Sequence, residues 1–403
     1  MNSIKFTVRA GHSDSGADCP LLYCLRSDHT SAVINSGFSI DPRKWDASAQ
    51  APDFRRIPPA ETQCYTLLAA ALEADRRRMM HIVAARCAGQ LPCDAHTLKA
   101  DFIAYRRRFA ITGYLLGIAD SLRSSGRLRT SETYRATASS VAKYLEGREM
   151  LIDEVDECFT ASWQQWMRRR GLTPNTTSFY MRILRAACHK AADEGALSAP
   201  GAFRNVYTGI DRTYKRALAL PDIQRIYMAR LEPGSCEAYA RDLFMLSFML
   251  RGISLIDLSY LRKSDIHQTH LIYTRSKTGR RLSIAWTPEM QAVAERLGSP
   301  SSPWLIELMG SPAERTRRAY LTNLARVNRY LKRVGERLGL SRQLTMYVAR
   351  HSWATGALSS GVPVHLISEG MGHSSERTTR IYLASLTSGE AIDRANARIL
   401  SAL

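Results

Sequence analysis

The spacing of hydrophobic residues changes once along this chain, near Pro59, and this change restricts the fold more than any other feature. Residues 3–10 and 21–40 are rich in β-branched and aromatic residues, in short alternating pieces broken by Gly, Asp and Ser. This pattern predicts strands and turns. After Pro59, apolar residues recur every three or four positions, which predicts helices. We therefore expect a multidomain, mainly α protein that opens with a small β-sheet.

Turn signals divide the helical part of the chain. Internal turns are expected at residues 124–126 and 171–176, where Gly and Ser or Gly, Pro and Asn gather. In the second turn, Thr173 or Asn175 could cap the helix that follows. The expected domains are a small sheet domain at residues 1–60, a helical connector at 61–108, a helical domain at 109–203, a basic linker within 199–216, and a third domain at 215–403.

One strand pair stands out in the mainly helical third domain. Residues 270–276 and 280–286 alternate in polarity and flank Lys277, Thr278 and Gly279, which favour a turn. The pattern predicts a β-hairpin with Lys277 at its neck.

The charge of the chain indicates a polyanionic partner. Lysine and arginine number 56 against 37 acidic residues, which gives a net charge of +19. Arginine triplets recur at residues 76–78, 106–108 and 168–170. Any one triplet is usually a solvated helix face, but their repetition favours nucleic acid, because each neutralised phosphate releases a counterion.

Membrane, secreted and metal-dependent classes are not indicated. The most apolar run, residues 243–250, is much shorter than the roughly 20 residues that span a bilayer. The N-terminus has no apolar stretch of signal-peptide length. The eight cysteines are scattered without a C-x-x-C pair, which predicts reduced thiols. We expect a cytoplasmic protein that does not bind a membrane and needs no metal or other cofactor.

Two segments near the C-terminus carry the chemistry: residues 346–358 (MYVARHSWATGAL) and 369–386 (EGMGHSSERTTRIYLASL). They contain Arg350, then Gly372 and His373, then Tyr382 nine positions after the histidine. This ordered set resembles the tyrosine recombinase (phage integrase) family, whose catalytic domain carries H-x-x-R, then G-H/W, then a tyrosine. The resemblance implies a tyrosine recombinase fold for the third domain, and a DNA strand-cleaving enzyme.

The residue types suit that reaction. A tyrosine hydroxyl can attack a phosphodiester as a covalent nucleophile. Guanidinium groups are bidentate, always charged donors for the charge that develops on phosphate oxygens. The resemblance implies Tyr382 as nucleophile, Arg350 as a phosphate-binding arginine, His373 as a hydrogen-bond donor to the phosphate, and Lys277 as the general acid.

The first departure from the family pattern is Tyr347, which stands where H-x-x-R has its histidine. A phenol can still donate a hydrogen bond to phosphate, but it is a poor base at neutral pH. We include Tyr347 among the site residues. The adjacent His351 is not a substitute, because neighbouring residues on a helix project about 100° apart; we interpret it as a packed structural residue.

The second departure is Ser254, which stands where the family box G-x-R-x-x-E-L-x-x-L has its first arginine. Arg251 lies three positions earlier. If a helix begins upstream of Arg251, the two positions share a face, so the arginine could reach the same phosphate. The alternative is an inactive or serine-only site. Asp257, at the acidic position of the box, is expected to support an arginine.

The resemblance extends to partners and assembly. It implies an arm-type DNA-binding sheet domain, a helical core-binding (SAM-like) domain, and a homotetramer that synapses two double-stranded DNA recombination sites, with accessory DNA-bending proteins as further partners. Residues 388–403 would dock on a neighbouring subunit or form an ordinary terminal helix.

The function implied is site-specific recombination through a 3′-phosphotyrosyl intermediate and a Holliday junction. The enzyme would be an integrase or a DNA invertase that serves a bacterial mobile element or an inversion switch, in association with the nucleoid. Two alternatives stay open: a type IB topoisomerase-like DNA relaxase, and a non-catalytic DNA-binding protein that retains the fold.

Overall fold

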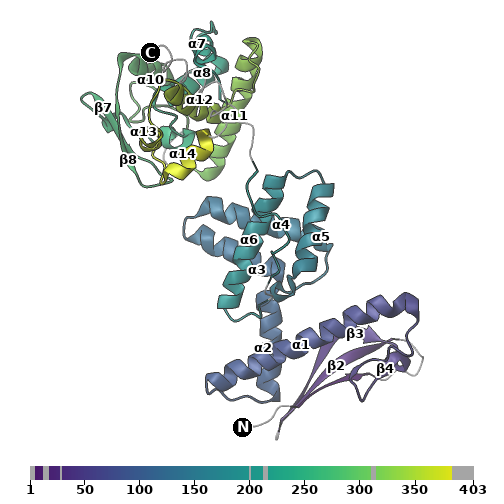
Figure 1. Cartoon of the computed structure of the whole chain (residues 1–403). Coiled ribbons are helices and arrows are strands. Elements are labelled where there is room, and N and C mark those ends of the chain that lie inside the picture. Colours follow the sequence, from purple (N-terminus) through teal and green to yellow (C-terminus); the bar gives the residue numbers. More distant parts are fainter. Residues whose placement is uncertain are drawn as a thin grey trace, which may run out of the picture. The chain divides into compact units, whose positions relative to one another are not determined.

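The computed structural model describes residues 5–11, 18–27, 30–198, 201–211, 217–309 and 315–383, without the side chains of Ile381 and Tyr382. The chain divides into two compact units, Met1–Asp211 and Arg212–Leu403 (Figure 1). Within the described ranges, no helix combines the length and the apolar character that crossing a membrane requires. The predicted docking segment 388–403 lies outside the described residues.

The first unit opens with a three-stranded antiparallel sheet, as predicted. Its strand order is β1-β2-β3, and alternate residues of β2 are buried, among them Leu21, Tyr23 and Leu25. A two-stranded sheet of β4 and β5 follows after the short helix η1. The bounds are β1 Lys5–Ala10, β2 Cys19–Arg26, β3 Ser31–Ile40, η1 Pro42–Lys44, β4 Trp45–Asp46 and β5 Ala51–Pro52.

Helices α1 (Thr62–Ala88) and α2 (Ala95–Phe109) pack beside this sheet after the short helix η2 (Pro59–Glu61) (Figure 1). Met79 and Phe102 from these helices share one core with Leu21. The Tyr23 hydroxyl donates to Asp75 of α1 at 2.7 Å. The segment expected to be a connector therefore packs with the small sheet, because its apolar face has that sheet to cover.

Four further helices complete the first unit. Trp163, Met167, Met181 and Leu184 are fully buried between them. Thr173 accepts a hydrogen bond from the backbone N–H of Thr176, so the predicted cap of the following helix is confirmed. The bounds are α3 Ile111–Ser124, α4 Leu128–Leu145, η3 Ile152–Glu154, α5 Glu157–Arg169 and α6 Pro174–Asp193.

A buried arginine joins two parts of this unit. Arg78 of α1 donates to Asp75 at 2.6 Å and to Asp153 of η3 at 2.7 Å and 2.9 Å. Tyr105 of α2 also donates to Asp153, at 2.6 Å. Burying a charge is tolerated here because every partner carries the opposite charge or donates a hydrogen bond.

The second unit is mainly helical with one small sheet at its edge (Figure 1). Helix α8 lies in its core and contacts α7, α10, α11 and α12. The sheet order is β6-β7-β8. The bounds are α7 Leu220–Tyr227, α8 Cys236–Met249, α9 Leu255–Ser259, η4 Lys263–Asp265, β6 Ile266–His267, β7 His270–Thr274, β8 Arg281–Ala285, α10 Pro288–Leu297, α11 Arg317–Arg337, α12 Met346–Ser359, α13 Val364–Gly370 and α14 Glu376–Leu383.

The predicted β-hairpin is present. Strand β7 pairs antiparallel with β8 from His270 opposite Ala285 to Thr274 opposite Arg281. The strands end earlier than predicted, because Arg275 closes a longer turn by donating its backbone N–H to the Arg280 carbonyl at 2.8 Å. Lys277 lies exposed within this turn.

Candidate active site

The turn between α8 and α9 holds Arg251 and Ser254. Arg251 has φ +56° and the next residue, Gly252, has φ +73°, so the backbone passes through the left-handed region. Ser254 caps α9. The expectation that Arg251 and Ser254 share a helix face is wrong, because both lie between two helices. The Cδ atom of Arg251 lies close to Gly370, at the end of α13.

The side chain of Arg350, on α12, contacts this turn and is buried, with 6% of the residue exposed. Its Nη1 donates to the Gly252 carbonyl at 2.8 Å, and its Nη2 donates to the Met371 carbonyl at 2.7 Å. Arg350 therefore holds the α8–α9 turn and the α13–α14 junction at one place.

Arg275, at the base of the hairpin, was not among the predicted site residues. It is buried, and its Nη1 donates to the carbonyls of Met371 at 3.1 Å and Gly372 at 2.5 Å. Because Arg275 and Arg350 donate to the same Met371 oxygen, two guanidinium groups lie side by side. A sequence signal existed: Arg275 continues the alternation of Leu271 and Tyr273 within the predicted strand 270–276, and in the structure all three side chains are buried.

Asp257 supports the hairpin from α9. Its Oδ1 accepts from the backbone N–H and the hydroxyl of Ser276 at 3.0 Å and 2.5 Å, and its Oδ2 accepts from the Ser254 hydroxyl at 2.7 Å. The expectation that Asp257 supports an arginine is wrong for the part of the chain described here: the hydrogen bonds it accepts come from serines and from backbone N–H groups. These bonds fix the segment that carries Arg275 and Lys277.

His373 follows the α13–α14 junction and is buried. Its Nδ1 lies 2.7 Å from the hydroxyl oxygen of Thr379. Burial disfavours the imidazolium ion, and the cations Arg350, Arg275 and Lys277 disfavour it further, which together lower the pKa of His373 to about 4. The ring is therefore neutral at pH 7 and carries one N–H.

Tyr347 is 57% exposed and lies three residues before Arg350 on α12. Its ring meets that of His351 edge to face, with centroids 4.4 Å apart. His351 is buried, as expected for a packed residue. Tyr382 lies in α14, and helix α14 packs against α12.

One pocket of about 350 Å³ collects several of these residues. Its lining includes Ser254, Arg275, Lys277, Tyr347 and Arg350, from three separate segments of the chain. Arg251 and His373 are not among the residues that line it. Three predicted site residues and the unpredicted Arg275 therefore face one cavity. Among the described residues, no group of three or more His, Cys, Asp or Glu side chains could hold a metal ion.

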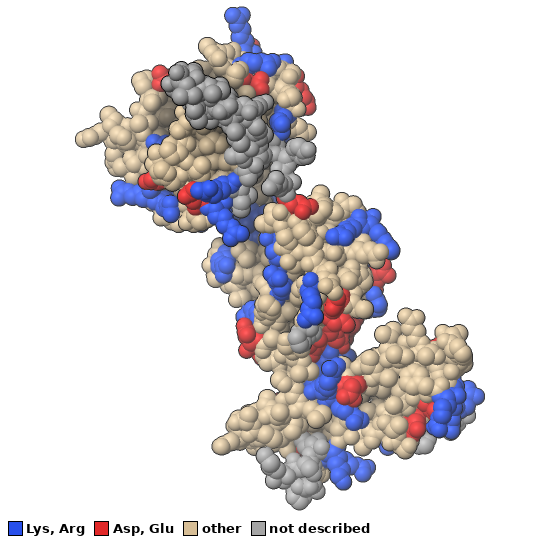
Figure 2. All heavy atoms as spheres, viewed as in Figure 1, with Lys and Arg blue, Asp and Glu red and all other residues tan. Residues whose placement is uncertain are grey.

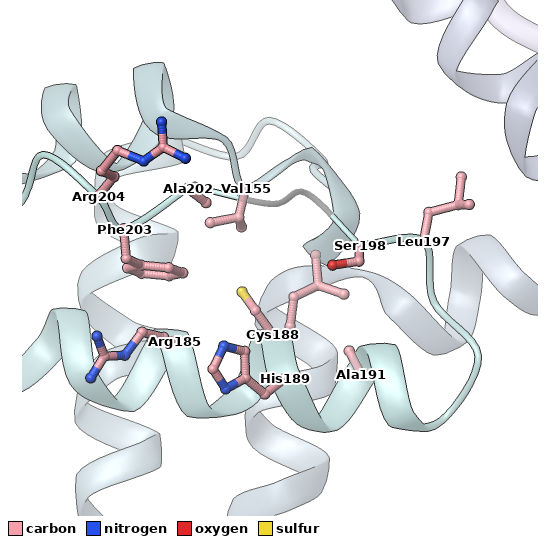
Figure 3. A pocket seen from close by; sticks show the side chains of 12 residues that line it. Val155, Arg185, Cys188, His189, Ala191, Leu197, Ser198, Ala202, Phe203 and Arg204 are labelled. Carbon is pink, nitrogen blue, oxygen red and sulfur yellow. The ribbon is translucent and has the colours of Figure 1, made fainter.

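A second hollow, of about 270 Å³, lies against α6 in the first unit (Figure 3). Arg185, His189 and Arg204 line it together with Cys188, and the lining includes no carboxylate. Burial raises the pKa of the Cys188 thiol to about 12, so this sulfur stays protonated and is a poor nucleophile. The arrangement suits contact with an anion rather than covalent chemistry.

Basic side chains are spread over the visible face of each unit (Figure 2). In the second unit they are dense on α11, whose exposed basic residues are Arg318, Arg326, Arg329, Lys332, Arg333 and Arg337. A helix of this kind provides the sequence-independent charge that DNA phosphates attract.

Two family models match the chain. The phage integrase SAM-like domain matches residues 113–204, and the phage integrase family matches residues 217–388. Among curated proteins, tyrosine recombinase XerD of Listeria innocua is 22% identical over 263 residues, which is 63% of this chain and 86% of the relative. Tyrosine recombinase XerA of Thermococcus kodakarensis is 29% identical over 180 residues, 43% of this chain and 59% of the relative.

Solved structures share the fold. A λ integrase dimer bound to a COC′ core site has a TM-score of 0.54 and 17% identity, and the match covers 93% of each chain. A λ integrase tetramer bound to a Holliday junction has a TM-score of 0.54 and 16% identity, covering 90% of this chain and 92% of that one. The fold class predicted from the sequence is thus confirmed. With the two family matches and the Xer relatives, it shows that this chain belongs to the phage integrase family of tyrosine recombinases, which are site-specific recombination enzymes.

Proposed function

We propose that this enzyme cleaves and rejoins DNA through a 3′-phosphotyrosyl intermediate, with Tyr382 as the nucleophile. The observation that carries the proposal is the pocket in which Lys277, Tyr347 and Arg350 meet, although they come from a hairpin and a distant helix. Family membership supplies the reaction class, and the pocket supplies the groups that the reaction needs.

The proposed step is a displacement at phosphorus. The Tyr382 oxygen forms a bond to the scissile phosphorus, the bond from phosphorus to the 5′ oxygen breaks, and the phenolic proton passes to water. Lys277 gives a proton to the departing 5′ oxygen. Its place on an exposed turn, fixed next to Ser276 and Asp257, lets the ammonium group reach a strand that lies over the pocket.

The phosphate itself is held by donors. Arg350 stabilises charge on the non-bridging oxygens, and Tyr347 donates a hydrogen bond from its hydroxyl. His373 acts as a donor in its neutral form. If the Thr379 hydroxyl donates to Nδ1, the ring proton resides on Nε2. In the reverse step the 5′ hydroxyl attacks the phosphotyrosine, and the bond energy is conserved.

The remaining parts of the chain are assigned to DNA binding and assembly. We assign residues 1–60 to arm-type DNA binding, 61–108 to a helical connection, 109–203 to core-site binding and 215–403 to catalysis. Matches to λ integrase, which has been solved as a dimer on a core site and as a tetramer on a Holliday junction, support a tetramer that synapses two DNA sites here. The +19 charge supports the same partner.

The biological setting proposed is integration, excision or inversion of a bacterial mobile element on the nucleoid, with accessory DNA-bending proteins. Arg251 is the candidate that the sequence suggests for the second phosphate-binding arginine; its side chain lies near Gly370 at the end of α13, and Arg251 is not among the residues that line the pocket.

The test uses the full-length chain and supercoiled plasmids that carry the DNA flanking its gene in one or two copies, with EDTA present. A recombinase forms a covalent protein–DNA adduct and, with two copies, exchanged products. Relaxation of plasmids regardless of copy number supports the relaxase alternative, and binding without any adduct supports the non-catalytic alternative. Either of these two outcomes contradicts the proposal.

A further inference from the structure

We propose that Arg275 supplies the second guanidinium group to the scissile phosphate, in place of the arginine that is absent at position 254. The inference rests on the proposed strand-cleavage function and adds a catalytic residue to it.

Arg275 lines the same pocket as Arg350 and Lys277. A guanidinium group has five N–H donors. The two on Nη1 are directed to the carbonyls of Met371 and Gly372. Within the described ranges, Nε and Nη2 donate no hydrogen bond, which leaves three donors for an anion. The two carbonyls thus fix the plane of the group without using the donors that a bidentate contact needs.

Charge in the site favours an anion between the two arginines. Arg275 has no carboxylate within ion-pair distance among the residues that the structure describes, and it lies beside the buried guanidinium of Arg350. A buried cation such as Arg275 is costly unless an opposite charge joins it. A phosphodiester has two non-bridging oxygens that share one negative charge, one oxygen for each guanidinium group. Burial lowers the pKa of His373 most, and Arg350, Arg275 and Lys277 lower it further, so these cations act on the same neighbourhood.

The turn that should carry the first arginine does not provide one. The Ser254 hydroxyl is bound to Asp257 at 2.7 Å. The side chain of Arg251 packs near Trp353 and Gly370 and does not line the pocket. Ser254 and Arg275 line the same cavity from different segments of the chain, so an arginine at either position could meet the same phosphate.

The role assigned to Arg275 is stabilisation of charge. It forms no covalent bond and transfers no proton while the Tyr382 oxygen displaces the 5′ oxygen at phosphorus. Removing one preorganised donor of this kind costs about 10²–10³-fold in rate.

The experiment measures the rate of covalent adduct formation by the full-length chain on a plasmid carrying the DNA that flanks its gene. Arg275→Ala should lower the rate about 100-fold or more. Arg275→Lys keeps a positive charge that can reach the carbonyls of Met371 and Gly372, but it loses the planar, bidentate guanidinium group. This variant should fold normally, and its rate of adduct formation should still fall about tenfold. Thr278→Ala is the matched structural control, because the Thr278 hydroxyl also donates to the Gly372 carbonyl, at 3.0 Å, without a charge; its rate should stay within about threefold.

A rescue separates catalysis from structure. Ser254→Arg in the Arg275→Ala background restores a guanidinium group to the pocket from position 254, where Asp257 can orient it. The rate of adduct formation should recover at least about tenfold. A purely structural Arg275 would not be rescued in this way.

The outcomes are distinct. Wild-type rates in both Arg275 variants, or a large loss in Arg251→Ala with none in Arg275→Lys, overturn the inference and leave the strand-cleavage proposal standing. Failure of the wild-type chain to form any adduct, with the DNA bound, contradicts the proposed function itself.

Discussion

A Cβ atom placed on Gly252 would lie 2.5 Å from the Cα atom of Arg350. Gly252, in the α8–α9 turn, therefore lies against the backbone of α12. Its carbonyl also accepts a hydrogen bond from the Arg350 side chain. Gly252 also has φ +73°, a conformation that L side chains rarely adopt. Both facts require glycine here, and together they set the position of the buried guanidinium.

Replacing Gly252 with alanine should be strongly destabilising. The left-handed backbone costs about 1–2 kcal/mol and the clash with Arg350 about 1–3 kcal/mol, so the free energy of unfolding should fall by about 2–5 kcal/mol. The matched control is Gly361→Ala, just after the end of α12, where φ is +85° and nothing lies within 4 Å of the added Cβ. Urea unfolding of both variants checks this; equal losses would show that the contact with Arg350 is unimportant.

Lys277→Ala should slow strand cleavage by about 100-fold or more, because the departing 5′ oxygen then lacks its proton donor. A DNA substrate whose scissile 5′ oxygen is replaced by sulfur needs no such proton, since a thiolate is a better leaving group. The variant should cleave this substrate at nearly the wild-type rate. If the sulfur substrate and the normal substrate suffer equally, Lys277 acts in some other way.

The stability of the second unit should depend on pH through His373. Its pKa is about 4 when folded and about 6.5 when unfolded, so the unfolded chain binds a proton more readily between these values. Stability should therefore fall as the pH is lowered from about 6.5 to 4, by on the order of 2–3 kcal/mol from this residue. Thermal melting of wild type and His373→Gln over this range measures the difference; parallel curves would contradict the assignment.

Much of the candidate site follows from local sequence. The triplet Lys277, Thr278 and Gly279 predicted the hairpin, because such residues favour a turn between alternating strands. The spacing of Arg350, His373 and Tyr382 indicated the family. These signals are local, so they can be read without knowing how distant segments meet.

The replacement for the missing arginine could not be found in the same way. Proximity in sequence favoured Arg251, but that residue lies in a left-handed turn and packs near Gly370. Arg275 reaches the pocket from the hairpin, which is separated in the chain from position 254 by α9 and η4. Only tertiary packing brings the hairpin to the pocket. Its position two residues after Tyr273, on the same side of the predicted strand 270–276, was the one sign in the sequence, and a single arginine in a basic chain does not stand out.

Affinity for DNA should fall steeply with salt, because phosphates are neutralised by many basic side chains. Between about 50 and 200 mM salt, binding to a duplex of about 40 base pairs should weaken about 10³-fold or more if several phosphates are contacted. Arg326→Gln on α11 should reduce the slope of log affinity against log salt by about one. Arg337, which already pairs with Glu237 at 3.0 Å, is the control and should change it less. An affinity that does not change with salt would argue against binding through many phosphate contacts.

The most direct test of the account is the identity of the residue joined to DNA. The full-length chain is incubated with plasmid carrying the DNA that flanks its gene, the adduct is digested with trypsin and nuclease, and the modified peptide is sequenced by mass spectrometry. The account predicts a nucleotide on Tyr382, at a 3′ phosphate, and no adduct with Tyr382→Phe. A nucleotide on another residue, or an undiminished adduct in the variant, would contradict it.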